Sequence, residues 1–310
     1  MQILTLDQIR ERIDDLAVID CMREAVIAQA RGECDTPMPM HLTISPLEKP
    51  GGEVHMKSSY RRGGKYFALK MATTFRGVGN GMMMLASAET GEPVALLQDA
   101  GHLTDVRTAA AAAMTARELG RADRTIGILG SGIQARLTAR FHAHVLPLET
   151  VWLWGRTPER VTECAEEIRR VVKDVRIAAS PAEVAAAARL LVTCTASRAP
   201  VLFARDLQVG THLSAVGADS VGKQELDPEI LRGAHVLLVD SVAQCEKLGE
   251  LQHAPDQAVR AVEIGEFCEQ HTGAGLHTRP GTNSAADFTG LGVEDLYIAE
   301  MVFRLWGCRE

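Results

Sequence analysis

The stretch Thr125-Ile126-Gly127-Ile128-Leu129-Gly130-Ser131-Gly132-Ile133-Gln134-Ala135 decides the fold of this chain. An apolar run ends in a glycine, a second glycine follows two residues later, and an alanine follows three residues after that. Residues 136–145 then favour a helix. This order of strand, tight turn and helix, with Gly-x-Gly-x-x-Gly/Ala spacing, is typical of a dinucleotide-binding unit.

Each small residue of the turn has a physical role in that interpretation. Gly130 lets the chain turn sharply, Gly132 lets a pyrophosphate approach the backbone, and Ala135 lets helix and strand pack closely. The first N–H groups of the helix then face the anion. A purely structural βα turn is the alternative, because glycine-rich turns are common. The candidate cofactor-binding residues in this turn are Gly130, Ser131, Gly132, Ile133, Gln134 and Ala135.

Length and composition are typical of a cytoplasmic enzyme of about two domains. Charged residues make up 24% of the 310 residues and hydrophobic residues 46%, which are ordinary values for a soluble globular protein. A net charge of −7 without a basic stripe argues against a nucleic-acid partner. No apolar run reaches the length of a membrane span. The seven scattered cysteines indicate free thiols in a reducing compartment.

The chain has a β-rich part before the glycine turn and an alternating part after it. Short apolar runs separated by glycine-bearing turns predict an antiparallel meander between residues 53 and 97. After residue 125, strands and helices alternate, which predicts a parallel, doubly wound sheet of the Rossmann type. We expect this α/β dinucleotide-binding domain over residues 119–290. An N-terminal α+β domain over residues 1–118 is completed by a C-terminal helix within residues 291–310.

The end of the second predicted strand of the α/β domain bears on the choice of cofactor. A site selective for NAD usually has an acidic residue there, which binds the ribose hydroxyls. This chain has Gly155, Arg156 and Thr157 instead. An arginine and a hydroxyl suit a 2′-phosphate, so we favour NADP over NAD, with Arg156 and Thr157 as binding residues. Alternatively, Arg156 is a solvated residue at a helix start.

Arg107 is the first of three charged residues that lie where chemistry can use them. It directly precedes a helix that we expect Thr108 to cap. An arginine beside helix N–H donors makes a good carboxylate receptor. The alternative is a structural ion pair with Asp105 or Asp99.

The other two residues are Lys70 and Asp219. Lys70 lies inside an apolar strand and is either an edge-strand gatekeeper or a desolvated lysine with a movable pKa. Asp219 comes after a strand of the parallel sheet, where open α/β sheets bind ligands. It is a candidate general acid/base, with a loop N-cap as the alternative.

Metal chemistry is not expected from the sequence. The ten histidines are dispersed. His142 and His144 are two residues apart, so on a helix they point to different faces. We therefore assign no metal ligands.

Four segments together resemble the ornithine cyclodeaminase/mu-crystallin family: residues 103–110, 130–135, 216–227 and 239–251. The resemblance covers nearly the whole chain. It implies an NAD(P)-dependent enzyme that transfers a hydride between the nicotinamide and the α-carbon of an amino or imino acid. Some members convert ornithine to proline and ammonia, and others reduce cyclic ketimines or interconvert an amino acid and its 2-oxo or imino form. The resemblance also implies homodimers formed through the N-terminal β domain.

The resemblance implies a role for each charged candidate. Arg107 would bind the substrate carboxylate, and Lys70 would orient the substrate or move protons. Asp219 would handle the proton at the α-nitrogen or activate an attacking amine. Thr195 and Ser197 would line the cofactor. We expect the three charged residues to converge on one pocket beside the nicotinamide.

This chain departs from the family pattern in the substrate-binding region. The family's second carboxylate-binding arginine, near position 40, is replaced by Met40. His41 is a partial substitute, and Lys57 is another candidate for the missing positive charge. A C-terminal Phe-Lys-Ser-x-Gly motif becomes residues 288–292, Phe-Thr-Gly-Leu-Gly. These changes put ornithine itself in doubt more than the hydride chemistry. They leave open a cofactor- or small-molecule-binding protein with little catalytic activity.

Overall fold

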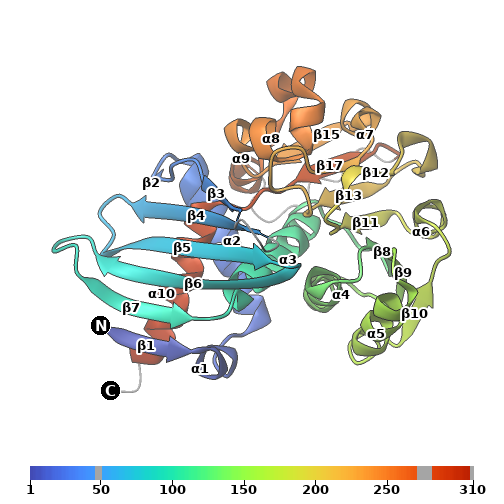
Figure 1. The fold of residues 1–310 in the computed structure, drawn as a ribbon. Coiled ribbons are helices and arrows are strands. Elements are labelled where there is room, and N and C mark those ends of the chain that lie inside the picture. The colour runs from blue at the N-terminus through green and yellow to red at the C-terminus, as the bar shows by residue number, and fades with distance from the viewer. Residues whose placement is uncertain (46–50, 271–280, 308–310) are drawn as a thin grey trace. The chain divides into compact units, whose positions relative to one another are not determined.

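The computed structural model describes residues 1–45, 51–270 and 281–307. The chain forms two compact units, coloured along the chain in Figure 1. The first unit comprises Met1–Arg107 and Leu291–Glu310, and the second comprises Thr108–Gly290. The division falls inside helix α3 (His102–Glu118), whereas the sequence suggested a boundary at the end of that helix.

The first unit is built on a seven-stranded sheet with the strand order β1-β7-β6-β5-β4-β2, in which β3 also pairs with β4. Strands β4 to β7 form an antiparallel meander, and β1 pairs in parallel with β7. The meander predicted from the sequence is therefore confirmed. The strands are β1 (Gln2–Thr5), β2 (Cys34–Asp35), β3 (Met40–Ile44), β4 (Gly52–Arg61), β5 (Tyr66–Phe75), β6 (Val78–Ser87) and β7 (Pro93–Gln98).

Helices α1 (Leu6–Arg10), α2 (Asp15–Ala30) and α10 (Gly292–Gly307) complete this unit. Helix α2 begins where the Asp14 carboxylate accepts a hydrogen bond from the Ala17 N–H (2.9 Å), a favourable N-cap. It buries Ile19 and Met22 completely, and each such side chain stabilises the fold by roughly 1.5–3 kcal/mol. Helix α10 contacts α2, β4 and β5 (Figure 1), so the predicted return of the C-terminal helix is confirmed.

The second unit contains an eight-stranded sheet with the order β10-β9-β8-β11-β13-β17-β15-β16, in which every neighbouring pair is parallel. The strands are β8 (Thr125–Leu129), β9 (Thr150–Trp154), β10 (Asp174–Ile177), β11 (Leu190–Thr193), β13 (His212–Ala215), β15 (Val236–Val239), β16 (Val262–Glu263) and β17 (Ser284–Asp287). Strands β12 (Arg198–Leu202) and β14 (Gln224–Leu226) form a separate parallel pair.

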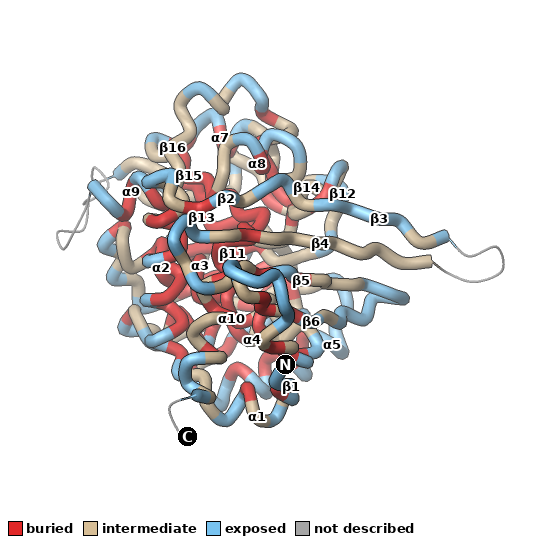
Figure 2. Tube along the Cα trace, turned by 90° about the vertical axis from the view of Figure 1, so that its left-hand side faces the viewer, coloured by how far each residue is buried: buried red, intermediate tan, exposed pale blue. Residues whose placement is uncertain are grey.

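The α-helices that begin in this unit are α4 (Ile133–Val145), α5 (Pro158–Ile168), α6 (Pro181–Ala187), α7 (Pro228–Gly233), α8 (Val242–Leu248) and α9 (Ile264–Gln270). Alternate residues of β11 enter two different cores: Leu190 and Val192 join residues of α4 and α5, and Leu191 joins residues of α6 and α7. Helices therefore cover both faces of the sheet, as the predicted doubly wound fold requires. Figure 2 shows the buried strands of this sheet in red.

Two further expectations concern the chain as a whole. In the described residues, no helix has the length and apolar character needed to cross a membrane. Six cysteines are free thiols, and five of them are buried. Cys308, the seventh, lies outside the described residues.

Candidate active site

The glycine turn joins β8 to α4 with the geometry of an anion-binding turn. Gly130 has a φ of +139°, and an added Cβ there would lie 2.6 Å from the Cys194 Sγ, so the turn requires glycine. At Gly132, by contrast, an added Cβ would have no neighbour within 4 Å. Packing therefore does not explain glycine at position 132, and the open surface there leaves room for a ligand to approach the backbone closely. Gly132 is the N-cap of α4 and has no side chain to satisfy the first helix N–H groups, which suits an anion.

The other residues of this turn divide between packing and exposure. Ala135 is fully buried and belongs to the core that joins β8 to α4. Ile133 is 50% exposed at the start of the helix. The backbone carbonyl of Ser131 accepts a hydrogen bond from the Arg136 guanidinium (3.0 Å), and Gln134 is half-buried. The glycine turn is thus tightly packed at Gly130 and open at Gly132, as the dinucleotide-binding interpretation requires.

The predicted site residues of the second unit lie along one edge of its sheet. Strands β9, β8, β11 and β13 are parallel neighbours, so their carboxyl ends share that edge. The glycine turn follows β8, Arg156 follows β9, Thr195 follows β11, and Asp219 follows β13. The strand order reverses between β8 and β11. Open α/β sheets bind ligands at such a point.

Position 155 lies against the glycine turn. An added Cβ at Gly155 would lie 2.9 Å from both the Ser131 Oγ and the Val161 Cγ2. Close packing is therefore a second reason why this position has glycine and no acidic side chain. Arg156 and Thr157 are exposed, and Thr157 is the N-cap residue of α5. Arg156 is therefore a solvated residue at a helix start, and it also lies at the edge formed by the carboxyl ends of the strands.

Glu225 connects the loops at this edge, and sequence analysis did not single it out. Its fully buried carboxylate accepts hydrogen bonds from the Thr195 N–H (2.5 Å), the Thr193 hydroxyl (2.9 Å) and the Gly217 N–H (2.8 Å). Burial raises the pKa of Glu225, and these donors oppose the shift. The carboxylate thus ties the loop after β11 to the loop that carries Asp219. Glu225 lies in the segment 216–227, one of the four that resemble the family, and this position was the signal in the sequence that could have identified it.

Ser197 belongs to the loop after β11. Its N–H donates to the Thr195 hydroxyl (3.3 Å), and its own hydroxyl donates to the Ala199 carbonyl (2.6 Å). Both predicted loop residues are half-buried. The loop is therefore ordered by internal hydrogen bonds and anchored through Glu225.

Glu225 belongs to a set of four buried carboxyl groups that we term the carboxyl cluster: Glu225, Asp240, Glu250 and Asp287. Glu250 accepts hydrogen bonds from the Glu225 N–H (2.6 Å) and the Leu226 N–H (3.1 Å). Burial raises the pKa of Glu250 to about 9 and that of Asp287 to about 7, and the neighbouring carboxyl groups add to both shifts. Glu250 therefore holds a proton at neutral pH, and Asp287 gains or loses one near neutral pH.

Asp219 is accessible to solvent at the same edge. Its Oδ1 accepts from the Lys223 Nζ (2.5 Å) and from the Ser220 hydroxyl (3.0 Å). Its side chain is 44% exposed. Residues 220–222 form a bend and a turn, so no helix begins directly after Asp219. The carboxylate is held in place and can be reached by a ligand.

In the first unit, two cations and two carboxylates form a buried group that we term the ion-pair cluster: Lys70, Arg107, Glu294 and Asp295. The Lys70 Nζ lies 3.1 Å from the Asp295 Oδ2. The Arg107 Nε donates to Asp295 (3.2 Å), and its Nη1 donates to Glu294 (3.1 Å). Asp295 therefore joins the two predicted cations. Both acids lie in the C-terminal helix, for which the sequence pattern predicted only a packing role.

Lys70 is a desolvated lysine. Strand β5 lies between β4 and β6, so the edge-strand gatekeeper interpretation is wrong. The pKa of Lys70 is lowered to about 7, mainly by burial; Asp295 opposes the shift, and Lys57 and Arg107 contribute to it. Burial alone raises the pKa of Asp295, but the surrounding cations outweigh it and lower that pKa. Lys70 can therefore gain or lose a proton near neutral pH.

The expected position of Arg107 before a helix was wrong. Helix α3 begins at His102, so Arg107 lies in its second turn and Thr108 is not its cap. The Asp99 carboxylate accepts a hydrogen bond from the Leu103 N–H (2.8 Å) at the start of that helix. The helix starts early because no glycine or proline interrupts residues 102–107, and the turn falls before them. The side chain of Arg107 meets the acids of α10, rather than helix N–H donors.

The two proposed substitutes for the missing arginine share the face of Lys70. His41 pairs with His55 between β3 and β4, and Lys57 pairs with Lys70 between β4 and β5. Directly opposed residues and alternate residues of one strand point to the same face. Met40 therefore points to the opposite face of the sheet. An arginine at position 40 would also point to that opposite face. Its replacement by Met40 therefore removes no positive charge from the face that carries Lys70.

The turn and the sheet order define a dinucleotide-binding domain, and comparison with known proteins gives the family. The model of the ornithine cyclodeaminase/mu-crystallin family matches residues 3–307, so the chain belongs to this family. It is 36% identical to an uncharacterized cyclodeaminase of Sinorhizobium fredii, covering 98% of this chain and 95% of that protein. The resemblance seen in the sequence is thus confirmed.

Two solved structures extend the comparison. An archaeal alanine dehydrogenase dimer with bound NAD has a TM-score of 0.85 at 27% identity, covering 98% of this chain and 95% of that one. The Δ1-pyrroline-2-carboxylate reductase of Thermococcus litoralis, in complex with NADH and L-proline, shares the fold with a TM-score of 0.88 at 23% identity, covering 98% and 97%. The chain is an NAD(P)-dependent enzyme of the ornithine cyclodeaminase/mu-crystallin type.

Proposed function

We propose that this enzyme interconverts a small amino acid and its imino or 2-oxo form, or acts as a cyclodeaminase through the same step. The observation that carries the proposal is the ion-pair cluster, in which a buried lysine with a pKa of about 7 and a buried arginine share Asp295. An arginine binds a substrate carboxylate, and such a lysine moves a proton. This pairing suits a substrate that carries a carboxylate next to a carbon that changes oxidation state.

The second unit offers a place for the cofactor. The open backbone at Gly132 and the N-terminus of α4 fit a pyrophosphate. When bound, the nicotinamide supplies or accepts the hydride. Thr195 and Ser197 line the cofactor in this proposal, and Glu225 positions their loop.

The chain's own residues perform the proton steps. Glu294 and Asp295 orient the Arg107 guanidinium, which binds the substrate carboxylate. Lys70 and Lys57 add positive charge on the same face of the sheet, and His41 lies on that face. Asp219 exchanges a proton with the α-nitrogen or activates an attacking amine. The substrate is then oriented through its carboxylate and protonated or deprotonated at nitrogen.

A substrate screen with a matched pair of variants tests this proposal. NAD(P)H oxidation is followed with ammonia or methylamine plus 2-oxo acids and with cyclic imines, and ammonia release is followed with ornithine. On the substrate found, Asp219→Asn lowers turnover by roughly 10²–10⁴-fold, and NAD(P)H affinity is unchanged. Asp7→Asn, at an exposed position, is the control. Parental turnover by Asp219→Asn overturns the mechanism, and the absence of any substrate favours a binding protein.

We propose further that the enzyme prefers NADP to NAD. Arg156 is exposed after β9, and no carboxylate occupies position 155. A charge-assisted hydrogen bond to a 2′-phosphate contributes roughly 1.5–3 kcal/mol. Arg156→Ala therefore weakens NADPH binding by roughly ten- to 150-fold and leaves NADH binding nearly unchanged. Arg160→Ala, at an exposed position of α5, is the control. Equal NADPH and NADH affinities of the parental enzyme contradict the preference.

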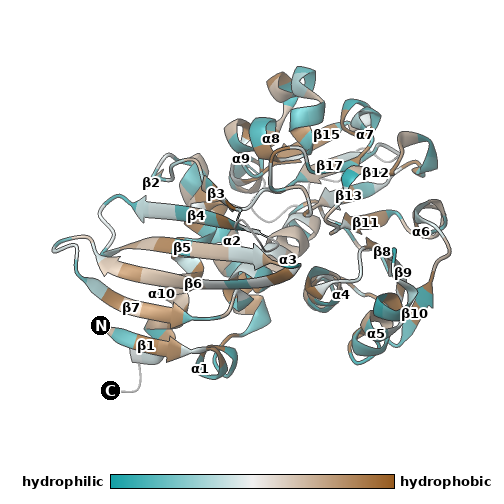
Figure 3. Ribbon diagram, viewed as in Figure 1, coloured by the Kyte–Doolittle hydropathy of each residue, from teal (hydrophilic) through white to brown (hydrophobic). Residues whose placement is uncertain are grey.

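The outer face of the first unit's sheet supports a proposal of a homodimer. Met40, Met56, Met71 and Met82 are aligned across β3 to β6, and Met40 is 61% exposed. Figure 3 shows β5 to β7 drawn largely in the hydrophobic colour. Exposed apolar patches mark interaction surfaces, and methionine adapts to partners.

The oligomeric state tests the dimer. Leu69 lies on the methionine face and is 42% exposed. Leu69→Glu places a charge in the proposed interface, so light scattering should find a dimer in the parental protein and a monomer in the variant. Val259→Glu, at a side chain that is 93% exposed in the second unit, should remain dimeric. A monomeric parental protein contradicts the proposal.

A further inference from the structure

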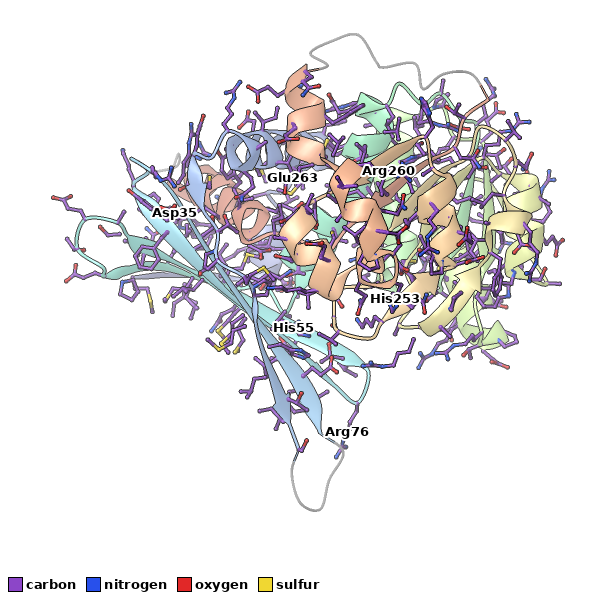
Figure 4. All side chains as sticks on the ribbon, turned by 90° about the horizontal axis from the view of Figure 1, so that it is seen from above. Asp35, His55, Arg76, His253, Arg260 and Glu263 are labelled. Carbon is purple, nitrogen blue, oxygen red and sulfur yellow. The ribbon has the colours of Figure 1, made fainter. Side chains whose placement is uncertain are left out.

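Three side chains with metal-binding donors meet on the first unit's sheet: His41, Glu53 and His55. One ligand atom from each lies within 4.8 Å of the others. The Glu53 Oε2 is 3.7 Å from the His55 Nε2 and 4.0 Å from the His41 Nε2. The two imidazole rings are stacked with their centroids 4.3 Å apart. Figure 4 shows His55 on strand β4.

Backbone pairing places these residues together. His41 is the direct partner of His55 in the β3–β4 ladder. Glu53 precedes His55 by two residues, so both side chains point to the same face of β4. The three Cβ positions are therefore fixed by the sheet, rather than by a loop. The sequence did not reveal the group, because a hairpin joins residues that lie 12 and 14 positions apart.

We propose that His41, Glu53 and His55 bind one divalent transition-metal ion, with Zn²⁺ as the best match. Two imidazoles and one carboxylate form the ligand set of open zinc sites. Imidazole nitrogen favours Zn²⁺ over Mg²⁺ and Ca²⁺, which prefer oxygen donors alone. The remaining coordination positions take water. The proposed hydride chemistry does not require this ion, although His41 also lies on the Lys70 face of the sheet.

The distances allow coordination after small rotations of the side chains. Tetrahedral bonds of 2.0–2.1 Å place ligand atoms about 3.4 Å apart. The separations of 3.7 and 4.0 Å exceed that value by about 0.3 and 0.6 Å, and the ligand atoms of the two histidines lie within 4.8 Å of each other. The side chains of His41, His55 and Glu53 are 31%, 18% and 34% exposed, so they have room to turn and the ion can enter from solvent.

The charges near the group predict moderate affinity. Glu53 neutralises half the charge of the ion. Lys57 shares the face of His55 and lies two residues further along β4, where its positive charge opposes a cation. Without a metal, the same groups form a partly exposed ion pair, which contributes at most about 1 kcal/mol to stability.

Metal titration of the full-length, untagged protein tests the proposal. After treatment with a chelator, Zn²⁺ is titrated in competition with a chromophoric chelator. We expect one equivalent of Zn²⁺ to bind. Glu53→Gln and His55→Asn should each raise the Zn²⁺ dissociation constant at least about tenfold, because even the outer partners of metal ligands contribute ten- to 100-fold. His235→Asn, at an exposed position of the second unit, should leave it unchanged.

Cobalt provides a readout of the ligands. Bound Co²⁺ should show the visible absorption of a four- or five-coordinate ion without a thiolate charge-transfer band. Circular dichroism checks that the variants are folded. The proposal is overturned if the parental protein binds no equivalent, if both site variants bind as tightly as the parental protein, or if the thiolate band places the ion on a cysteine. None of these readouts depends on turnover, so the metal site and the proposed function are tested separately.

Discussion

The two buried charged clusters of this protein offset the free-energy cost of burying charge in different ways. The ion-pair cluster of the first unit balances Lys70 and Arg107 with Glu294 and Asp295. The carboxyl cluster of the second unit is stabilised by hydrogen-bond donors, among them the Thr195 and Gly217 N–H groups. Buried charge is costly in both cases. One cluster offsets the cost with opposite charge, and the other with backbone N–H groups and bound protons.

The difference shows what each cluster is suited to do. In the ion-pair cluster, Arg107 stays charged and fixed in orientation, as recognition of an anion requires. In the carboxyl cluster, the carboxyl groups accept hydrogen bonds from backbone N–H groups of different loops. The pKa values of Glu250 and Asp287 rise to about 9 and about 7. The first arrangement suits recognition of a charged group. The second arrangement serves loop geometry.

Removing a shared acid from the ion-pair cluster gives the largest expected effect. Asp295→Ala leaves Lys70 and Arg107 buried without this partner, and breaking a buried pair in this way costs about 3–5 kcal/mol. Urea unfolding monitored by circular dichroism measures the loss. Glu24→Ala, at an exposed position of α2, should change the unfolding free energy by less than about 0.5 kcal/mol. Similar losses in both variants would show that the cluster is not what stabilises this unit.

How much of the fold and of the two clusters could be predicted from the sequence depends on how far apart along the chain the interacting residues lie. Local patterns predicted the glycine turn, the antiparallel meander between residues 53 and 97, and the alternation of strands and helices after residue 125. These features depend on a few neighbouring residues. The candidate positions Lys70, Arg107 and Asp219 were also available from the sequence.

The partners of those candidates were not predictable in the same way. Arg107 meets acids of α10 that lie 187 and 188 positions away, and Glu225 joins loops from two other strands. Helix and strand periods show which face of an element is apolar, but not which charged residue of another element meets it. The predicted helix start at Thr108 was wrong because the helix begins directly after the turn at residues 100 and 101, and Thr108 lies inside it.

Changing one acceptor of the carboxyl cluster should have a smaller effect. Glu225→Gln replaces one oxygen with an N–H donor that faces the donors of Thr193, Thr195 or Gly217. An unsatisfied buried group costs about 1–3 kcal/mol. We expect the KM for NAD(P)H to rise more than kcat falls, because the loop that we propose to line the cofactor loses its anchor. Glu229→Gln, at an exposed position of α7, should change neither. An unchanged KM in Glu225→Gln contradicts the anchoring role.

The pH dependence of stability distinguishes bound protons from ion pairs. Burial raises the pKa of Asp287 from 3.8 to about 7. The folded state therefore holds a proton that the unfolded state releases, and this stabilisation is lost as the pH rises from about 4 to about 7. The unfolding free energy of the parental protein minus that of Asp287→Asn should fall across this range and level off above it.

Urea unfolding at several pH values measures this difference. The buried His142 and His212, whose pKa values burial lowers to about 4 and about 3, produce the opposite slope. Both proteins contain these histidines, so their contribution cancels in the subtraction. Asp7→Asn should give a difference that does not vary in this way. A difference that rises with pH would show that Asp287 is held as a carboxylate.

The smallest effect on stability is expected at the exposed pair of Asp219 and Lys223. Their side chains are 44% and 20% exposed, although the Oδ1–Nζ distance is 2.5 Å. Solvent screens such pairs, so Lys223→Ala should lower the unfolding free energy by less than about 1 kcal/mol. The same measurement on Asp295→Ala provides the comparison. Equal losses would mean that burial does not determine how much a charged pair contributes here. If stability is kept while turnover changes, the lysine acts on the chemistry of Asp219, rather than on the fold.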